Sequence, residues 1–103
     1  MNNLTSKNYA ELKEKKVVFV DFWASWCGPC MALSPIYQII SERYQDKAEF
    51  MKCNVDNEQE LALKHNIMSI PCILAFVNGE VKDKLVGLTN ADGLTNFVEK
   101  NLK

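Results

Sequence analysis

Apolar residues run almost without interruption through residues 17–22, which read Val-Val-Phe-Val-Asp-Phe. A strand with one face in water alternates apolar and polar residues, whereas a strand covered on both faces is apolar at nearly every position. We therefore expect a central strand at 17–22, with parallel neighbours and with helices on both faces of its sheet. Residues 49–55 are the next strand candidate.

A helical repeat follows the first strand. From residue 28 onward, apolar side chains recur every three or four positions, which predicts one helix with an apolar stripe that ends near Tyr44. An earlier helix is expected to run from Thr5 or Ser6, either of which can cap it, to about Lys15. This assignment leaves only residues 3–4 for any preceding strand.

The middle of the chain carries the signals of a short helix. Asn57 is followed three residues later by Glu60, which resembles a capping box at a helix start. Asn66 is suited to the left-handed conformation that ends many helices. We therefore expect a short helix between Asn57 and Asn66.

The last third of the chain predicts a hairpin and a closing helix. Two strand candidates, 73–77 and 81–86, flank Asn78-Gly79, the dipeptide that best fits a two-residue turn between antiparallel strands. Asn90 is placed to cap a final helix whose apolar side chains share one face.

The order of these elements predicts an α/β fold. A βαβ crossover, a further helix, a hairpin and a last helix give a mixed sheet of four to five strands, with a very short first strand and about four flanking helices. With 103 residues, the chain has the length of one domain, which we expect to span residues 1–103.

Charge and hydropathy narrow the possible partners. Twelve basic and thirteen acidic side chains give a net charge of -1, so nucleic-acid binding and a polybasic membrane anchor are not expected. The apolar runs are far shorter than the ~20 residues that cross a bilayer. Since the first residues lack a basic region followed by an apolar segment, we expect no signal peptide and a cytoplasmic location.

Four cysteines in such a location indicate catalysis, metal binding or inert packing, because the cytoplasm keeps thiols reduced. Two of them stand in residues 23–30, which read Trp-Ala-Ser-Trp-Cys-Gly-Pro-Cys. This spacing puts Cys27 in front of a helix and Cys30 in its first turn, with Pro29 at the first helical position. Free N–H groups and the positive end of the helix dipole favour a thiolate at Cys27, and a thiolate is the nucleophile of disulfide exchange.

The chain resembles the thioredoxin family from about Leu4 to its C-terminus. Several separate features carry this resemblance in the family's order, and a Cys-x-x-Cys alone would be weak evidence. They are Asp-Phe-Trp-Ala at 21–24, Trp-Cys-Gly-Pro-Cys at 26–30, Asn-Val-Asp at 54–56, Ile-Pro at 70–71, Asn-Gly at 78–79 and Gly87.

The resemblance implies a protein-disulfide reductase with a thioredoxin fold. Cys27 is expected to attack a target disulfide and form a mixed disulfide, which Cys30 then resolves to give a Cys27–Cys30 disulfide. Gly28 and Pro29 between the cysteines are similar to those of the reducing branch of the family. No bound cofactor is implied beyond the redox-active cysteine pair.

Asp21 is unusual because an acid inside an apolar strand loses hydration, which raises its pKa. The resemblance implies that Asp21 accepts the proton of Cys30 through water, with Lys52 on the neighbouring strand able to pair with it. An acid that merely ends a strand is the alternative reading.

The resemblance also implies a docking surface for extended target segments. Pro71 is expected to be a cis proline that faces the disulfide, and the backbone of Ile70 to pair with the target. The expected apolar patch consists of Trp26, Gly28, Pro29, Ile70 and Gly87.

Two positions near the cysteines depart from the family's usual pattern. Met31 follows Cys30 where relatives often have Lys or Arg, which predicts weaker steering of acidic targets. Cys72 follows Pro71 where threonine is usual. We hypothesise that Cys72 forms an off-path disulfide with Cys27 or a glutathione adduct, and inert packing is the alternative.

The expected partners are disulfide-containing proteins and a thioredoxin reductase, with the NADPH-dependent flavin type favoured over a ferredoxin-linked one. A monomer is expected. Three alternatives stay open: a zinc site using Cys27, Cys30, Cys53, Cys72 or His65, a non-catalytic clamp, and a reductase dedicated to one target.

Overall fold

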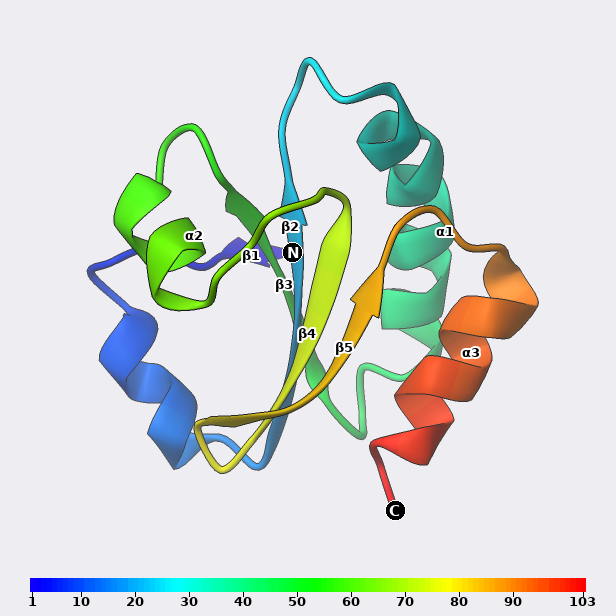
Figure 1. Ribbon diagram of the computed structural model, residues 1–103. Coiled ribbons are helices and arrows are strands. Elements are labelled where there is room, and N and C mark those ends of the chain that lie inside the picture. The colour runs from blue at the N-terminus through cyan, green and yellow to red at the C-terminus, as the bar shows by residue number, and fades with distance from the viewer.

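Strands and helices alternate along most of the chain in the computed structural model, which describes residues 1–103. In chain order the elements are β1 (Asn2–Asn3), the 3-10 helix η1 (Tyr9–Glu14), β2 (Val17–Trp23), α1 (Gly28–Arg43), β3 (Glu49–Asn54), α2 (Gln59–Lys64), β4 (Cys72–Val77), β5 (Glu80–Val86) and α3 (Ala91–Lys100). Figure 1 shows η1 and α2 on one side of the sheet and α1 and α3 on the other.

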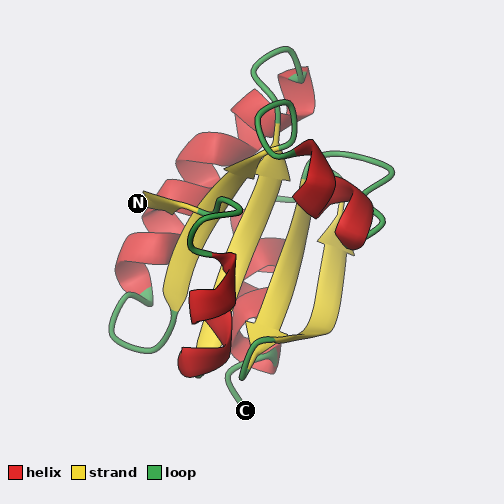
Figure 2. Ribbon diagram, turned by 90° about the vertical axis from the view of Figure 1, so that its left-hand side faces the viewer, coloured by secondary structure: helices red, strands yellow, loops and turns green.

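The sheet is mixed and has the strand order β1-β3-β2-β4-β5. The central strand β2 pairs in parallel with β3 and antiparallel with β4, and β4 and β5 form the antiparallel hairpin. β1 adds only two paired residues to the far edge of β3. The sheet lies between two layers of helices (Figure 2), so the predicted fold class and the very short first strand are confirmed.

Two apolar cores cover the two faces of β2. Successive side chains of a strand point to opposite faces. Val18, Val20 and Phe22 therefore join the cluster on the side of η1 and α2, while Phe19 joins the cluster formed with α1 and α3. Asp21 lies two residues after Phe19, so its side chain is on the face covered by α1.

The hairpin and the last helix start as predicted. Asn78 and Gly79 have φ angles of 54° and 85°, which suits the two left-handed positions of the turn. Any side chain at Gly79 would begin 2.6 Å from the Cα of Lys13, so the turn also needs glycine for its packing on η1. The Asn90 side chain caps α3 by accepting the backbone N–H of Gly93 at 2.8 Å.

The first helix starts later than predicted and is a 3-10 helix. Neither Thr5 nor Ser6 caps it, because residues 5–8 form a turn of their own. In that turn the Asn8 side-chain oxygen accepts the backbone N–H of Thr5 at 2.8 Å. The chain therefore enters the helix only after Asn8.

The predicted cap of α2 is also wrong, although the helix exists. Asn57 and Glu58 both donate their backbone N–H groups to the carbonyl of Asn54, at 3.1 and 3.0 Å. This turn follows β3 directly and delays the helix to Gln59, with no side chain capping it. Its end is as predicted, since Asn66 has a φ of 54°.

Candidate active site

Cys27 and Cys30 lie at the N-terminal end of α1 and form a disulfide. Cys27 immediately precedes the helix, and its Sγ accepts the backbone N–H of Cys30 at 3.2 Å. The two Cα atoms are 5.2 Å apart, within the usual range of about 4.4–6.8 Å for bonded cysteines. Pro29 occupies the second helical position, not the predicted first, and its missing N–H still falls among those that the helix leaves unpaired.

This position favours a thiolate at Cys27 once the disulfide is reduced. The unpaired N–H groups of the first turn and the helix dipole both stabilise negative charge there. The N–H of Cys30 already points at the sulfur. The surrounding cluster is small and apolar: Ala24 and both cysteines are buried in it, and Trp23, Val55 and Ile70 pack against it.

The segment that faces the disulfide contains the Ile70–Pro71 peptide bond, which is cis, as the sequence resemblance implies. The carbonyl oxygen of Ile70 lies 3.8 Å from Cys27 Sγ. Gly87, which follows β5, donates its N–H to the carbonyl of Pro71 at 2.8 Å. Ile70 thus borders the redox pair, and Gly87 is tied to Pro71, the residue that follows Ile70.

Trp26 directly precedes Cys27 in the chain and is 69% exposed. Its indole N–H donates to the carboxylate of Asp56 at 2.9 Å, which ties the loop before α1 to the loop after β3. Gly28 and Pro29 are exposed beside it. An exposed apolar ring held by a hydrogen bond is suited to contact with a partner, and sequence reasoning did not assign Asp56 this role.

Asp21 lies on the α1 face of β2 and is completely buried. Neither carboxylate oxygen has a hydrogen-bond partner. Burial raises the pKa of Asp21 from its ordinary 3.8 to about 6, and the positive charge of Lys52 opposes this rise only in part. Trp23, two residues later on the same face, packs against the cluster of Cys30.

Lys52 is the cross-strand neighbour of Asp21 in the β2–β3 ladder. No ion pair joins the two side chains: the ion pairs of the structure are Lys15–Glu49 and Lys100–Asp83. The Lys52 ammonium donates to the Ser34 hydroxyl at 3.3 Å and lies 4.4 Å from the centre of the Trp23 ring.

Ser34 was not identified from the sequence. It stands four residues after Cys30, so a helix places both residues on the same side. A hydroxyl at this position is the signal in the sequence that could have identified Ser34 as part of the site.

Cys72 and Cys53 are free thiols, and both belong to the apolar cluster on the side of η1 and α2. Cys27 belongs to a different cluster. Cys72 is 2% exposed, and burial raises its pKa. Burial also raises the pKa of Cys53, to about 12. Both thiols are therefore poor nucleophiles in the folded protein.

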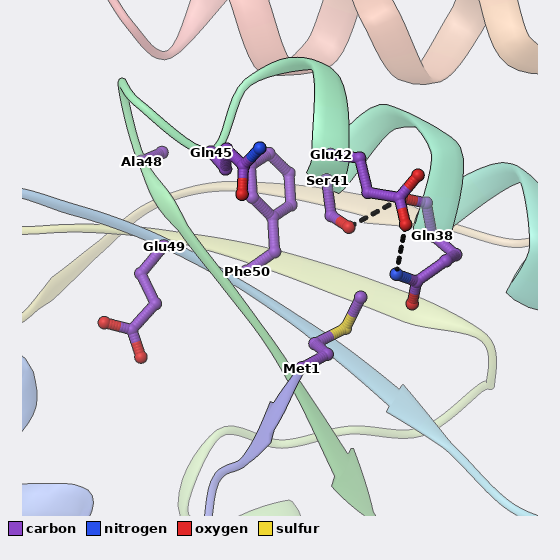
Figure 3. A pocket seen from close by; sticks show the side chains of 8 residues that line it. All are labelled: Met1, Gln38, Ser41, Glu42, Gln45, Ala48, Glu49 and Phe50. Carbon is purple, nitrogen blue, oxygen red and sulfur yellow. Dashed lines mark hydrogen bonds between the residues drawn. The ribbon is translucent and has the colours of Figure 1, made fainter.

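The residues of the zinc alternative do not converge, since no group of three or more His, Cys, Asp or Glu side chains could hold a metal ion. His65 instead forms a hydrogen bond of 2.7 Å with the Tyr9 hydroxyl, and its ring packs against Phe76 and Phe22. A surface hollow of about 470 Å³ lies beside the C-terminal half of α1 and the start of β3. Figure 3 shows it to be lined by Gln38, Glu42 and Glu49 among others, and it contains none of the redox residues.

The family model of thioredoxin matches residues 1–100 of the chain. The chain belongs to the thioredoxin family. It is 41% identical to a thioredoxin of Rickettsia bellii over 103 residues, which are 98% of each protein. It is 37% identical to a thioredoxin of Staphylococcus haemolyticus over 99 residues, covering 96% of this chain and 95% of the relative.

A solved structure of Plasmodium falciparum thioredoxin is similar to this one with a TM-score of 0.89. The two chains are 34% identical, and the match covers 97% of this chain and 98% of the other. Thioredoxins are thiol-disulfide oxidoreductases, so the Cys27–Cys30 pair of this thioredoxin-family chain is a redox-active disulfide and the chain has thiol-disulfide reductase activity. None of its helices is long and apolar enough to span a membrane.

Proposed function

We propose that the chain reduces protein disulfides through Cys27 as nucleophile and Cys30 as resolving thiol. The observation that carries this assignment is the position of Cys27 in front of α1, where its sulfur accepts the N–H of Cys30. The Ile70 carbonyl beside that sulfur supports docking of an extended target segment along the same edge. Trp26, Gly28, Pro29 and Gly87 complete the proposed docking surface.

The proposed reaction has two exchange steps. The Cys27 thiolate attacks one sulfur of the target disulfide, so that a Cys27–target bond forms and the other target sulfur leaves as a thiolate. Cys30 then loses its proton to Asp21 through water and attacks Cys27 Sγ, which releases the second target sulfur as a thiolate and forms the Cys27–Cys30 disulfide. The target gains two electrons, and the cysteine pair loses two.

Asp21 is suited to the role of proton acceptor in the second step. A pKa of about 6 means that the carboxyl is ionised at neutral pH, yet it binds a proton far more readily than an ordinary aspartate. Its buried oxygens have no competing hydrogen-bond partner. Lys52, across the β2–β3 ladder, is proposed to tune this role: its positive charge opposes the rise in the pKa of Asp21 only in part, and it forms no ion pair with the carboxylate.

The proposed partners are disulfide-containing proteins and a thioredoxin reductase, of the NADPH-dependent flavin type by analogy with the family's usual route. We place the protein in the cytoplasm as a monomer of one domain, residues 1–103. The two free thiols, Cys53 and Cys72, are consistent with a reducing compartment.

The reduction of insulin by dithiothreitol, followed as precipitation of the freed chain, tests this function. The protein should accelerate the reaction well above dithiothreitol alone, and Cys27→Ser should remove the acceleration. Asp46→Asn, an exposed change away from the redox pair, is the control and should keep it. No acceleration by folded, reduced protein would contradict a general reductase and point to a dedicated or non-catalytic role.

A further inference from the structure

Lys52 lies opposite Asp21 in the sheet but forms its contacts elsewhere. The two residues face each other across the β2–β3 ladder, and the Asp21 oxygens have no other partner. Opposite charges attract strongly where water is scarce, so an ion pair would be the simple expectation. The Lys52 ammonium nevertheless bonds to Ser34 and lies over the Trp23 ring, with no ion pair to Asp21.

Ser34 holds the Lys52 ammonium in the observed position, away from an ion pair with Asp21. It lies in α1 and is half-buried, and its hydroxyl is the one hydrogen-bond acceptor of the Lys52 ammonium, at 3.3 Å. The face of Trp23 attracts the same ammonium from β2, at 4.4 Å. The two contacts together hold the charge beside the ring.

We propose that Ser34 is a positioning residue, which holds the Lys52 ammonium over the Trp23 ring and apart from the Asp21 carboxyl, so that the carboxyl remains a base strong enough to take the proton of Cys30. This inference rests on the proposed role of Asp21. It adds a residue of α1 that acts on that carboxyl only through Lys52.

The other titratable groups around Asp21 are uncharged, so the charge that affects its pKa is that of Lys52. Tyr37 from α1 donates its hydroxyl to two backbone carbonyls, and burial raises its pKa well above the ordinary value, so it stays neutral. Cys72 from β4 also stays neutral, because burial raises its pKa. Cys30 from α1 does not titrate while it is in the disulfide.

Removal of the Ser34 hydroxyl should move the ammonium toward Asp21. Ser34→Ala leaves Lys52 without an oxygen acceptor, and the unpartnered carboxylate is its cross-strand neighbour. A positive charge within about 4–6 Å lowers the pKa of a carboxyl by about 1–3 pH units. We expect the pKa of Asp21 to fall by about 1 pH unit in this variant.

The test is a carbon-13 NMR titration of the aspartate carboxyls in the oxidised protein, with wild type, Ser34→Ala and Ser34→Thr compared. Threonine keeps the hydroxyl and should preserve the wild-type titration. Alanine favours helix more than serine does, so the variant should fold. The same comparison in a Lys52→Met background should show no effect of Ser34→Ala.

An unchanged or raised pKa of Asp21 in Ser34→Ala would overturn the proposal. So would a lowered pKa that persists with Lys52→Met, because Ser34 would then act without Lys52. The titration needs neither a target nor turnover, so its failure is separate from a failure of the insulin assay, which tests the proposed function itself.

Discussion

Replacement of Asp21 by asparagine should stabilise the protein at neutral and alkaline pH. The side chain is completely buried, and neither oxygen accepts a hydrogen bond, so its ionised form is poorly solvated in the fold. In the unfolded chain the same carboxylate is in water. Asp21→Asn keeps the size of the side chain and removes the charge.

The magnitude follows from the pKa in the two states. The pKa of Asp21 is about 6 in the fold against an ordinary 3.8, a difference of about 2.2 pH units. Since each pH unit corresponds to 1.36 kcal/mol, ionisation costs the folded state about 3 kcal/mol. Because the pKa of Asp21 is raised in the fold, its ionisation costs the wild type nothing well below pH 3.8. As the pH rises from below 3.8 to above about 6, the free energy of unfolding falls by about 3 kcal/mol.

Urea unfolding of wild type and Asp21→Asn between pH 4 and pH 8 measures this effect. The variant should be more stable by about 3 kcal/mol at pH 8, and the difference should shrink to within about 1 kcal/mol at pH 4. Asp46→Asn, a change at an exposed acid, is the control and should show no such pH dependence. A stability difference that is the same at both pH values would contradict this prediction, because it would not arise from ionisation of Asp21.

Three further substitutions test other parts of the account. Met31→Lys adds a positive charge directly after Cys30 and should speed reduction of acidic targets by less than about 10-fold at low ionic strength. The gain should vanish in Met31→Gln and at high salt, and a gain that survives high salt would argue against charge steering. Asn90→Ala removes the cap of α3 and should lower the unfolding free energy by about 1 kcal/mol in urea titrations, whereas an unchanged midpoint would show that the cap is dispensable. Because Cys72 is buried and burial raises its pKa, folded reduced protein kept with excess oxidised glutathione should gain no adduct at Cys72. An adduct seen by mass spectrometry at Cys72 and missing in Cys72→Thr would contradict this and favour a regulatory thiol.

The sheet and its hairpin could be predicted because their signals are local. The apolar run of β2 requires cover on both faces, and Asn78-Gly79 accepts the two left-handed positions of its turn. Asn90 and Asn66 likewise act on residues close to them in the chain. For the turn, the cap of α3 and the end of α2, the deciding interaction involves neighbours in sequence.

The wrong helix starts have the same kind of cause. At Thr5 and at Asn57 a capping residue was present, but a tight turn used the nearby backbone groups first. The hydrogen bonds of a helix cap compete with those of a tight turn for the same backbone groups. The sequence pattern does not show which set is more stable.

The redox pair could be predicted from its spacing together with the family's other motifs along the chain, whereas its supporting contacts could not. The bonds of Lys52 to Ser34 and of Trp26 to Asp56 join residues 18 and 30 positions apart. Lys52 has two possible partners, Asp21 across the ladder and the Ser34 hydroxyl on α1. Which of them Lys52 contacts depends on how α1 packs on the sheet. Only the packed structure shows which one it takes.

The most direct test of the central claim is to trap the mixed disulfide. Reduced Cys30→Ser protein mixed with insulin should accumulate a covalent adduct, visible without reductant and mapped by mass spectrometry to Cys27. Reduced Cys27→Ser protein should form none, because Cys30 is 1% exposed and lies inside the first turn of α1, whereas Cys27 lies in front of the helix and is 5% exposed. An adduct at Cys30 or Cys72 in place of Cys27, or no adduct in Cys30→Ser, would contradict the account.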